Sequence, residues 1–336
     1  MRKIILSALM IMGVMNVTKA ADWNMYDTKV PLDSIITDGG RISSKVEVEY
    51  QNGNISCLTY YYKTGETWDL RSRQQYSYDA QGREIELLMQ SFTDGAWVND
   101  TKTTRTYGVS NAQEPSLILT EYWYKAENKW INQTKSEVTF NGAGLPTDYH
   151  MYTWVSDAWS AIQWNQIKYN EQNQRSESYL LNWLIAKNDW VNSMRYIYYY
   201  DDRGNTIKTT SDEWDQTVEP NDWTLVNTEE VEYNDDNKPI LITTTREQKS
   251  LMTYKSMNEF FYNNIGDMEQ LIVWVWNSSE MKYELNSTTN FYYRAGQAIE
   301  SVAGNSAIVT RKLFRDGQVL IQKGDKTFTL TGQEVK

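Results

Sequence analysis

A tryptophan followed ten residues later by a tyrosine recurs along this chain and constrains its fold more than any other feature. The clearest copy runs from Trp190 to Tyr200. The tyrosine-type position returns every 28 to 33 residues, at Tyr50, Tyr78, Tyr107, Phe140, Tyr169, Tyr200, Tyr233, Tyr262 and Tyr293. The position ten residues earlier holds Trp68, Trp97, Trp130, Trp159, Trp190 and Trp223, and then Met252 and Tyr283 in the last two units.

The even length of this gap predicts where the two rings lie. Side chains of a β-strand alternate between its two faces. Ten is even, so tryptophan and tyrosine should share one face at opposite ends of a single strand. The residue two before the tyrosine is mostly apolar, as at Val138 and Phe260, with Arg105 as an exception that either extends its charge to water or marks a distorted unit.

A tight turn is predicted after each tyrosine. The next residue is often Asp or Asn, as at Asp79 and Asn141. The fourth residue is Asn54, Gly82, Asn111, Gly144, Asn173, Gly204, Asn237 or Gly266. Gly and Asn tolerate the left-handed backbone region best, and this order is typical of a type I turn closed by a left-handed residue. Each unit is therefore predicted to be a β-hairpin.

These patterns predict an all-β fold, an array of about eight antiparallel β-hairpins with a period near 30 that forms a curled or spiralling sheet. The predicted organisation is a signal peptide at residues 1–20, an N-terminal lead-in at 21–40, the repeat domain at 41–297 and a C-terminal β tail at 298–336. Within the tail, short strands are expected at residues 318–322 and 326–330.

The N-terminus indicates export. Arg2 and Lys3 precede an apolar run from Ile4 to Met15, and cleavage is expected after Ala20. No later stretch is apolar enough to cross a membrane. Cleavage would remove Arg2, Lys3 and Lys19 but no acid, which takes the net charge from −11 to −14. That charge disfavours nucleic acid and anionic membranes as partners. The expected location is secreted or at the outer cell surface.

Two segments resemble known families. Residues 76–83, Tyr-Ser-Tyr-Asp-Ala-Gln-Gly-Arg, and residues 198–205 look like the YD repeat of the RHS family. That resemblance implies hairpins in a long spiralling sheet, as on cell-surface and toxin-delivery proteins. The tail from Lys312 to Lys336 is similar to C-terminal type IX sorting segments of secreted Bacteroidetes proteins, which implies an export address. A hairpin that caps the last repeat is the alternative.

Few residues suit catalysis. His150 is the only histidine and Cys57 the only cysteine, so Ser-His-Asp and Cys-His triads have almost no candidates. Zinc sites of His and Cys and intrachain disulfides are excluded within one chain. No catalytic, cofactor-binding or metal-binding residue is predicted, and no cofactor. The pairs Asp201–Asp202 and Asp235–Asp236 could bind calcium, although turn chemistry explains them equally. With 44 acidic residues, a carboxylate pair is possible, but no pattern selects one.

The aromatic residues are the best functional clue. Further rings are found at Trp154, Trp164, Trp183, Trp214, Trp274 and Trp276. They form the core of a thin sheet or, if exposed, a surface on which sugar rings stack. The sequence therefore predicts a secreted or cell-surface, non-catalytic repeat protein that acts as a binding or scaffolding module for polysaccharide or another surface protein. Its alternatives are a glycan-binding protein using exposed Trp and Tyr and a carboxylate-dependent glycoside hydrolase.

Overall fold

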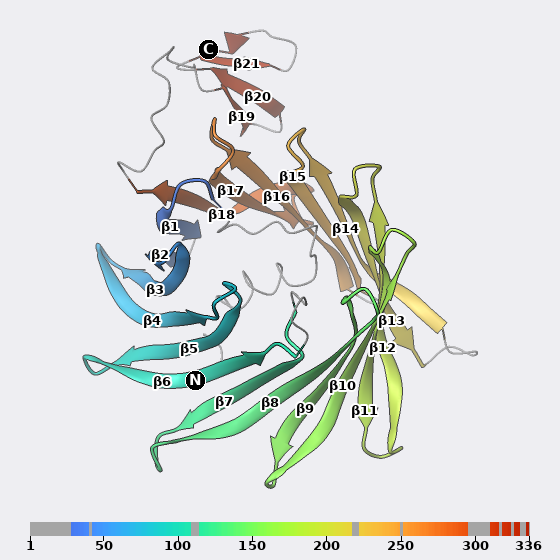
Figure 1. Ribbon diagram of the computed structural model, residues 1–336. Coiled ribbons are helices and arrows are strands. Elements are labelled where there is room, and N and C mark those ends of the chain that lie inside the picture. The colour runs from blue at the N-terminus through green and yellow to red at the C-terminus, as the bar shows by residue number, and fades with distance from the viewer. Residues whose placement is uncertain are drawn as a thin grey trace.

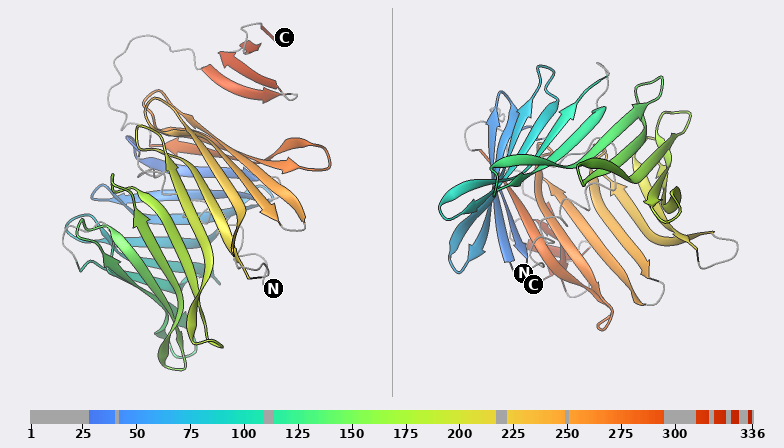
Figure 2. Two further views of the ribbon diagram at one scale, coloured as in Figure 1. Left: turned by 90° about the vertical axis from the view of Figure 1, so that its right-hand side faces the viewer. Right: turned by 90° about the horizontal axis from the view of Figure 1, so that it is seen from below.

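Eighteen consecutive strands form one antiparallel sheet that closes on itself. The computed structural model describes residues 28–39, 42–108, 114–216, 222–248 and 251–294, and four strands within 310–335. Each strand pairs with the next, and β1 pairs with both β2 and β18 (Figure 1). Figure 2 shows the wall of strands from two further sides. The sheet is therefore a barrel. The predicted signal peptide lies outside the described residues.

The strands are long and similar in length. The first nine are β1 Leu32–Gly39, β2 Ile42–Gln51, β3 Asn54–Thr64, β4 Thr67–Tyr78, β5 Glu84–Thr93, β6 Ala96–Thr106, β7 Leu117–Tyr124, β8 Lys129–Phe140 and β9 Pro146–Val155. The next nine are β10 Ala158–Tyr169, β11 Arg175–Leu184, β12 Asp189–Tyr200, β13 Thr206–Asp215, β14 Asp222–Tyr233, β15 Pro239–Gln248, β16 Leu251–Tyr262, β17 Met268–Asn277 and β18 Lys282–Tyr293.

Barrel closure corrects the predicted architecture. An open, spiralling array of about eight hairpins, and the RHS-type sheet that the resemblance implied, are both wrong. The strand that closes the ring, β1, lies in the segment predicted as an N-terminal lead-in. Local patterns specify hairpins, but closure depends on twist and curvature that accumulate over all strands. The repeat pattern carries no signal for that sum.

The predicted turns are confirmed in six of the units. Gly82, Gly144, Asn173, Gly204, Asn237 and Gly266 all have positive φ. In the first of these turns, the Gly82 amide donates to the Asp79 carbonyl at 3.0 Å. The Asp79 carboxylate accepts hydrogen bonds from the Gln81 and Arg83 amides, both at 2.9 Å. The β2–β3 turn differs, since Asn52 and Gly53, not Asn54, have positive φ. Asn111 lies outside the described residues.

A β-bulge reverses the predicted placement of the two rings. In β12, Leu180 pairs with Met194 but Leu181 pairs with Asn192, so Ser193 is an extra residue. The same shift occurs three residues after the tryptophan position in β4, β6, β8, β10, β14 and β18. One extra residue turns the rest of the strand over. Tryptophan and tyrosine therefore lie on opposite faces, and the shared-face prediction is wrong. We name these faces the tryptophan face and the tyrosine face.

On the tyrosine face, the phenol near the end of one strand donates a hydrogen bond to the beginning of the strand before it, close to the preceding turn. The Tyr169 hydroxyl donates to the Pro146 carbonyl at 2.7 Å, and the Tyr200 hydroxyl to the Arg175 carbonyl at 2.8 Å. The same contact joins Tyr78 to Ile55, Tyr107 to Glu84, Tyr233 to Thr206, Tyr262 to Pro239 and Tyr293 to Met268. Burial raises the pKa of the Tyr233 phenol to about 12. A neutral, half-buried phenol thus links successive turns.

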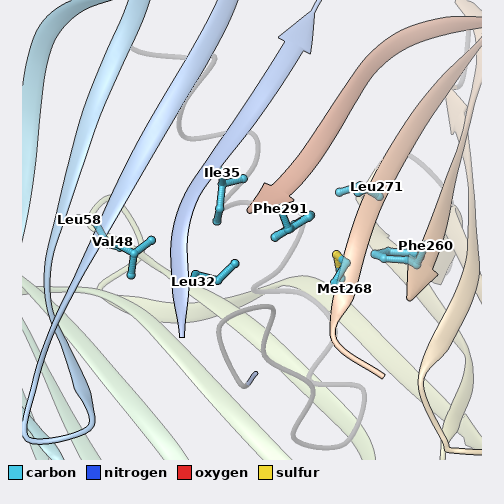
Figure 3. Close-up of a cluster of buried hydrophobic side chains, with 8 residues drawn as sticks. All are labelled: Leu32, Ile35, Val48, Leu58, Phe260, Met268, Leu271 and Phe291. Atoms are coloured by element: carbon cyan, nitrogen blue, oxygen red, sulfur yellow. The ribbon is translucent and has the colours of Figure 1, made fainter. Parts of the chain in front are cut away.

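The main apolar core lies on the tyrosine face where the barrel closes. Its buried members come from β1, β2, β3, β16, β17 and β18, and they are Leu32, Ile35, Val48, Leu58, Phe260, Met268, Leu271 and Phe291 (Figure 3). Leu32 is fully buried. Arg105 also lies on this face, at the mostly apolar position two residues before the tyrosine, and it forms an ion pair with Glu84. The core therefore covers the junction between the two ends of the sheet.

Polar contacts hold the N-terminal segment at the same junction. The Asp267 carboxylate accepts the Lys29 amide at 2.7 Å and the Val30 amide at 3.0 Å. The Arg294 amide donates to the Pro31 carbonyl at 3.1 Å, and the Tyr50 hydroxyl accepts the Leu32 amide at 3.1 Å. Asp267 itself is buried. These bonds occupy backbone groups that the end of a closing strand would otherwise leave unpaired.

The C-terminal tail forms a separate four-stranded antiparallel sheet. Its strands are β19 Thr310–Arg315, β20 Gln318–Lys323, β21 Lys326–Thr329 and β22 Glu334–Val335. The two short strands expected at residues 318–322 and 326–330 correspond to β20 and β21.

Candidate functional site

Pairs of aromatic rings face each other across the hairpin ends of the tryptophan face. In each pair, the next-to-last paired positions before the connection hold two rings in edge-to-face contact. Their centroids lie about 5 Å apart: Phe92–Trp97 at 5.2 Å, Trp123–Trp130 at 5.0 Å, Trp154–Trp159 at 4.9 Å, Trp183–Trp190 at 5.2 Å, Trp214–Trp223 at 5.0 Å and Trp276–Tyr283 at 5.1 Å. We call this ring of pairs the aromatic band. Edge-to-face geometry suits the ring quadrupoles.

A cation from the preceding unit lies over one tryptophan in several pairs of the band, and over Trp68 on β4 as well. Arg73 lies 4.4 Å from the Trp97 centroid, and Arg195 lies 5.2 Å from the Trp223 centroid. The same relation joins Lys45 to Trp68 at 5.7 Å, Lys102 to Trp130 at 5.0 Å and Lys135 to Trp159 at 5.3 Å. From β4 onward, the cation stands five residues after its own tryptophan. That odd spacing returns it to the tryptophan face only because the bulge intervenes.

The cations are themselves paired with polar groups. Lys102 Nζ lies 2.7 Å from Glu121, and the Arg195 guanidinium lies 2.7 Å from Asp212. Arg73 Nε donates to Gln90 at 2.6 Å. Along the same row, hydrogen bonds from Tyr179 and Lys168 lower the pKa of the Glu177 carboxyl below its usual value. The tryptophan face therefore carries a continuous network of charge and aromatic contacts.

The band does not present a row of open indole faces. Every tryptophan in the described ranges is half-buried, because a neighbouring ring or cation covers part of it. In the unit where tryptophan replaces the cation, Trp164 packs edge-on against Trp190 at 5.8 Å. His150 stacks on Trp164 at 5.0 Å, and the Trp164 indole donates to Asp148 at 3.0 Å. The only histidine is thus part of the aromatic packing.

Four exposed apolar side chains lie beyond the band at three consecutive hairpin ends, while others, such as Ile42 and Leu285, are spread over the rest of the barrel. Tyr124 closes β7, Val155 closes β9 and Leu184 closes β11, and each directly follows a tryptophan of the band. All three are exposed, as is Ile185 at the tip of the β11–β12 hairpin. Figure 1 shows these three hairpin ends next to one another along the lower edge of the barrel. Sequence reasoning missed this surface, although each residue stands next to a recurring tryptophan.

The acidic turns do not assemble a metal site. Asp201 Oδ1 accepts the Arg203 amide at 3.0 Å and the Asn205 amide at 2.8 Å, while Oδ2 accepts the Asn205 side chain at 2.9 Å. Hydrogen-bond donors thus already occupy both oxygens of this carboxylate. Across the described ranges, no three His, Cys, Asp or Glu side chains come together as a candidate metal site. Cys57 is a buried free thiol.

A recess of about 670 Å³ lies between the turn at residues 263–267 and the N-terminal segment. Two lysines line it. Lys29 Nζ donates to the Ile265 carbonyl at 2.5 Å, and Lys238 Nζ donates to the Gly266 carbonyl. Their ammonium groups therefore serve the closing junction of the barrel. The described part of the chain contains no helix with the length and hydrophobicity that a membrane crossing requires.

Comparison with known proteins reveals only low similarity. No family model matches the chain, and no curated protein matches it. A porin-like protein from Bacteroides uniformis has a TM-score of 0.40 at 7% identity, covering 80% of this chain and 99% of that one. A second porin-like protein, from Bacteroides vulgatus, has a TM-score of 0.33 at 10% identity, covering 80% and 100%. A DUF3836 family protein from Parabacteroides distasonis has a TM-score of 0.22 at 18% identity, covering 26% and 84%. At TM-scores this low, the likenesses carry no argument about function.

Proposed function

We propose that this chain is a non-catalytic binding scaffold of the cell exterior, which contacts its partner through the hairpin ends of β7–β12. One observation carries the proposal. The indoles are committed to internal pairs and cation contacts, whereas large apolar side chains stand exposed at these ends. Apolar side chains gathered on an exposed surface are typical of an interaction site.

The barrel is well suited to hold such a surface still. Tyrosine hydroxyls join the two strands of these hairpins, as Tyr169 on β10 does with Pro146 on β9, and cation–aromatic contacts on the other face join one hairpin to the next. Rigid presentation lowers the entropy cost of binding. The predicted signal peptide supports placement of this scaffold outside the cell.

Binding of purified, fluorescently labelled protein to cells of its own source tests the proposal. The variant Val155→Asp/Leu184→Asp should lose binding, because charge replaces the exposed apolar groups at two adjacent ends. Thr93→Asp, at the exposed end of the β5–β6 hairpin, is the matched control and should bind as the parent does. Equal binding by all three proteins would refute the hairpin ends as the contact surface.

The non-catalytic part of the proposal has its own test. Incubation with a panel of polysaccharides, followed by measurement of new reducing ends, should show no cleavage. Cleavage that survives repurification, and that disappears when one carboxylate is replaced by its amide, would establish the hydrolase alternative instead.

Glycan binding along the aromatic band is the second candidate. Its specific support is repetition: aromatic pairs stand at the ends of five consecutive hairpins from β5–β6 to β13–β14, so successive sugar rings of an extended glycan could each meet one pair. Polar groups such as Gln90 and Asn99, joined at 2.7 Å, lie beside the rings. Tryptophan fluorescence titrated with soluble polysaccharides should change if sugars stack there. An unchanged spectrum across the panel would eliminate this candidate.

A closed barrel of this size can also enclose an aqueous channel. A lipid-facing wall must avoid charge, since one Arg or Lys at mid-bilayer costs about 2–4 kcal/mol. Here the tryptophan face carries Arg73, Lys102 and Lys135, and the tyrosine face carries the Arg105–Glu84 pair. Both faces thus carry charge, and we do not propose a channel.

A further inference from the structure

We propose that the hairpin ends of β7–β12 dock onto a zwitterionic lipid surface. This inference rests on the proposed function, because it names the partner of the same surface. Ile185 is 80% exposed, Val155 54%, and Leu184 and Tyr124 38% each. They project from three consecutive hairpins, so their ends lie along one edge of the barrel (Figures 1 and 2).

Tryptophan pairs stand directly behind these projecting residues. Trp123–Trp130, Trp154–Trp159 and Trp183–Trp190 occupy the next-to-last paired positions of the same three hairpins. Each ring is half-buried. An indole combines an apolar body with a polar N–H, and tryptophan is therefore enriched where a membrane meets water. Aliphatic tips with an indole layer behind them match the order of acyl region and headgroups in a bilayer.

The net charge of these hairpin ends indicates which class of lipid headgroup they fit. Their exposed segments, residues 124–129, 155–158 and 184–189, carry Lys125, Lys129 and Lys187 against Glu127, Asp157 and Asp189. The balance is zero, whereas the whole chain has a net charge of −11. An anionic surface would repel the rest of the molecule. A zwitterionic headgroup layer meets no such repulsion at these neutral ends.

The spacing of the apolar residues favours lipid over a protein partner. Neighbouring hairpins pair only as far as Thr134–Thr153 and Gln163–Asn182, so their ends project separately beyond the shared sheet. Polar residues such as Asn128 and Asn188 stand among the projecting side chains. A protein partner would need a complementary pocket for each one. A fluid lipid surface accommodates separate projections without shape complementarity.

Co-sedimentation of the full chain with phosphatidylcholine vesicles tests the inference. The parent protein should sediment with the vesicles, and Ile185→Asp should weaken partitioning by about tenfold or more, the factor that one buried aliphatic side chain contributes. Met281→Asp is the matched control, because Met281 is 78% exposed at the β17–β18 hairpin end, outside the proposed surface. It should partition as the parent does. Brominated lipid should quench the tryptophan fluorescence of the parent and of Met281→Asp to the same extent, and that of Ile185→Asp less.

Three results would overturn the inference: no sedimentation of the parent, equal weakening by Met281→Asp, or stronger binding to anionic vesicles. The cell-binding assay separates this failure from failure of the proposed function. If cells bind the protein through the β7–β12 ends but lipid vesicles do not, the partner is not lipid and the scaffold function stands. If neither cells nor vesicles bind, both proposals fail.

Discussion

The guanidinium carbon of Arg73 on β4 lies 4.4 Å from the centroid of the Trp97 ring on β6, although β5 separates the two strands. Arg73 reaches this position because the bulge at Arg71 turns the strand over between Trp68 and Arg73. The same combination of a bulge and a cation–tryptophan contact recurs in other units. It links each hairpin to the next through side chains that cross an intervening strand.

Removal of this cation should destabilise the barrel. We expect Arg73→Ala to lower the free energy of unfolding by about 1 kcal/mol, the order of a partly shielded cation–π contact. A double-mutant cycle with Trp97→Leu, measured by chemical denaturation, isolates the contact itself. Arg71→Ala is the control, since the Arg71 side chain is 52% exposed and lies 6.0 Å from the Tyr62 centroid, at the outer limit of a cation–aromatic contact. A larger loss for Arg71→Ala would contradict the assignment.

Loss of a tyrosine hydroxyl should weaken the link between adjacent turns. Tyr169→Phe removes the 2.7 Å bond to the Pro146 carbonyl, and we expect a loss of about 1 kcal/mol in unfolding free energy. Tyr199→Phe, at a side chain 44% exposed on the tryptophan face, should change stability by less than about 0.5 kcal/mol. Equal effects in thermal or urea unfolding would show that the hydroxyl contact contributes nothing specific.

The turn glycines provide a test of backbone conformation alone. Gly82 has φ of +77°, and no atom lies within 4 Å of an added Cβ. Gly82→Ala should therefore cost about 1 kcal/mol through left-handed strain only. Gly142 occupies a similar turn with equally open space but without positive φ, so Gly142→Ala should leave the denaturation midpoint unchanged. A shift of the same size at both positions would exclude backbone strain as the cause.

The closing strand should be the most sensitive apolar site. Leu32 is 0% exposed at the junction of β1 with β18 and β2. We expect Leu32→Ala to cost about 2–5 kcal/mol, as for other buried leucines. Leu285→Ala, at a side chain 58% exposed, is the matched control and should be nearly neutral. A small effect at Leu32, measured by calorimetry, would mean that closure does not depend on this core.

Alkaline pH should unfold the barrel. Burial raises the pKa of Tyr61 and Tyr233 to about 12 each and also raises the pKa of Tyr78 and Tyr200. A phenol whose folded pKa exceeds its unfolded value near 10 stays protonated in the folded state. Its stabilisation is complete below about pH 10 and falls as pH rises toward about 12. Circular dichroism and phenolate absorbance should change together in that window. Ionisation of these phenols well below it, with the fold intact, would contradict their burial.

Much of the local structure was predictable because its causes are local. Gly204 and Asn237 need a left-handed backbone and stand at fixed distances after a tyrosine, so the turns and the strands around them could be placed. The bulge could not be placed, because Ser193 and its counterparts share no residue type. The cation five residues after tryptophan was its only trace, and it goes unnoticed when strict alternation is assumed.

The candidate site was harder to predict than the fold. The recurring tryptophans indicated that aromatic side chains form the candidate site. The cations that lie over them come from a different repeat unit, as Arg195 does for Trp223. Exposure depends on which strands are neighbours and on where the hairpins end. Ile185 carries no repeated pattern that marks it as the most exposed large apolar residue at these ends.

The sequence by itself determined that the chain forms antiparallel hairpins with a period near 30, because turn and strand preferences act over a few residues. Only the tertiary structure decided that the hairpins close into a ring. The Thr37 and Thr289 hydroxyls meet at 2.9 Å although 252 residues separate them. Contacts of that range depend on the summed twist of every strand between them, and no single repeat encodes that sum.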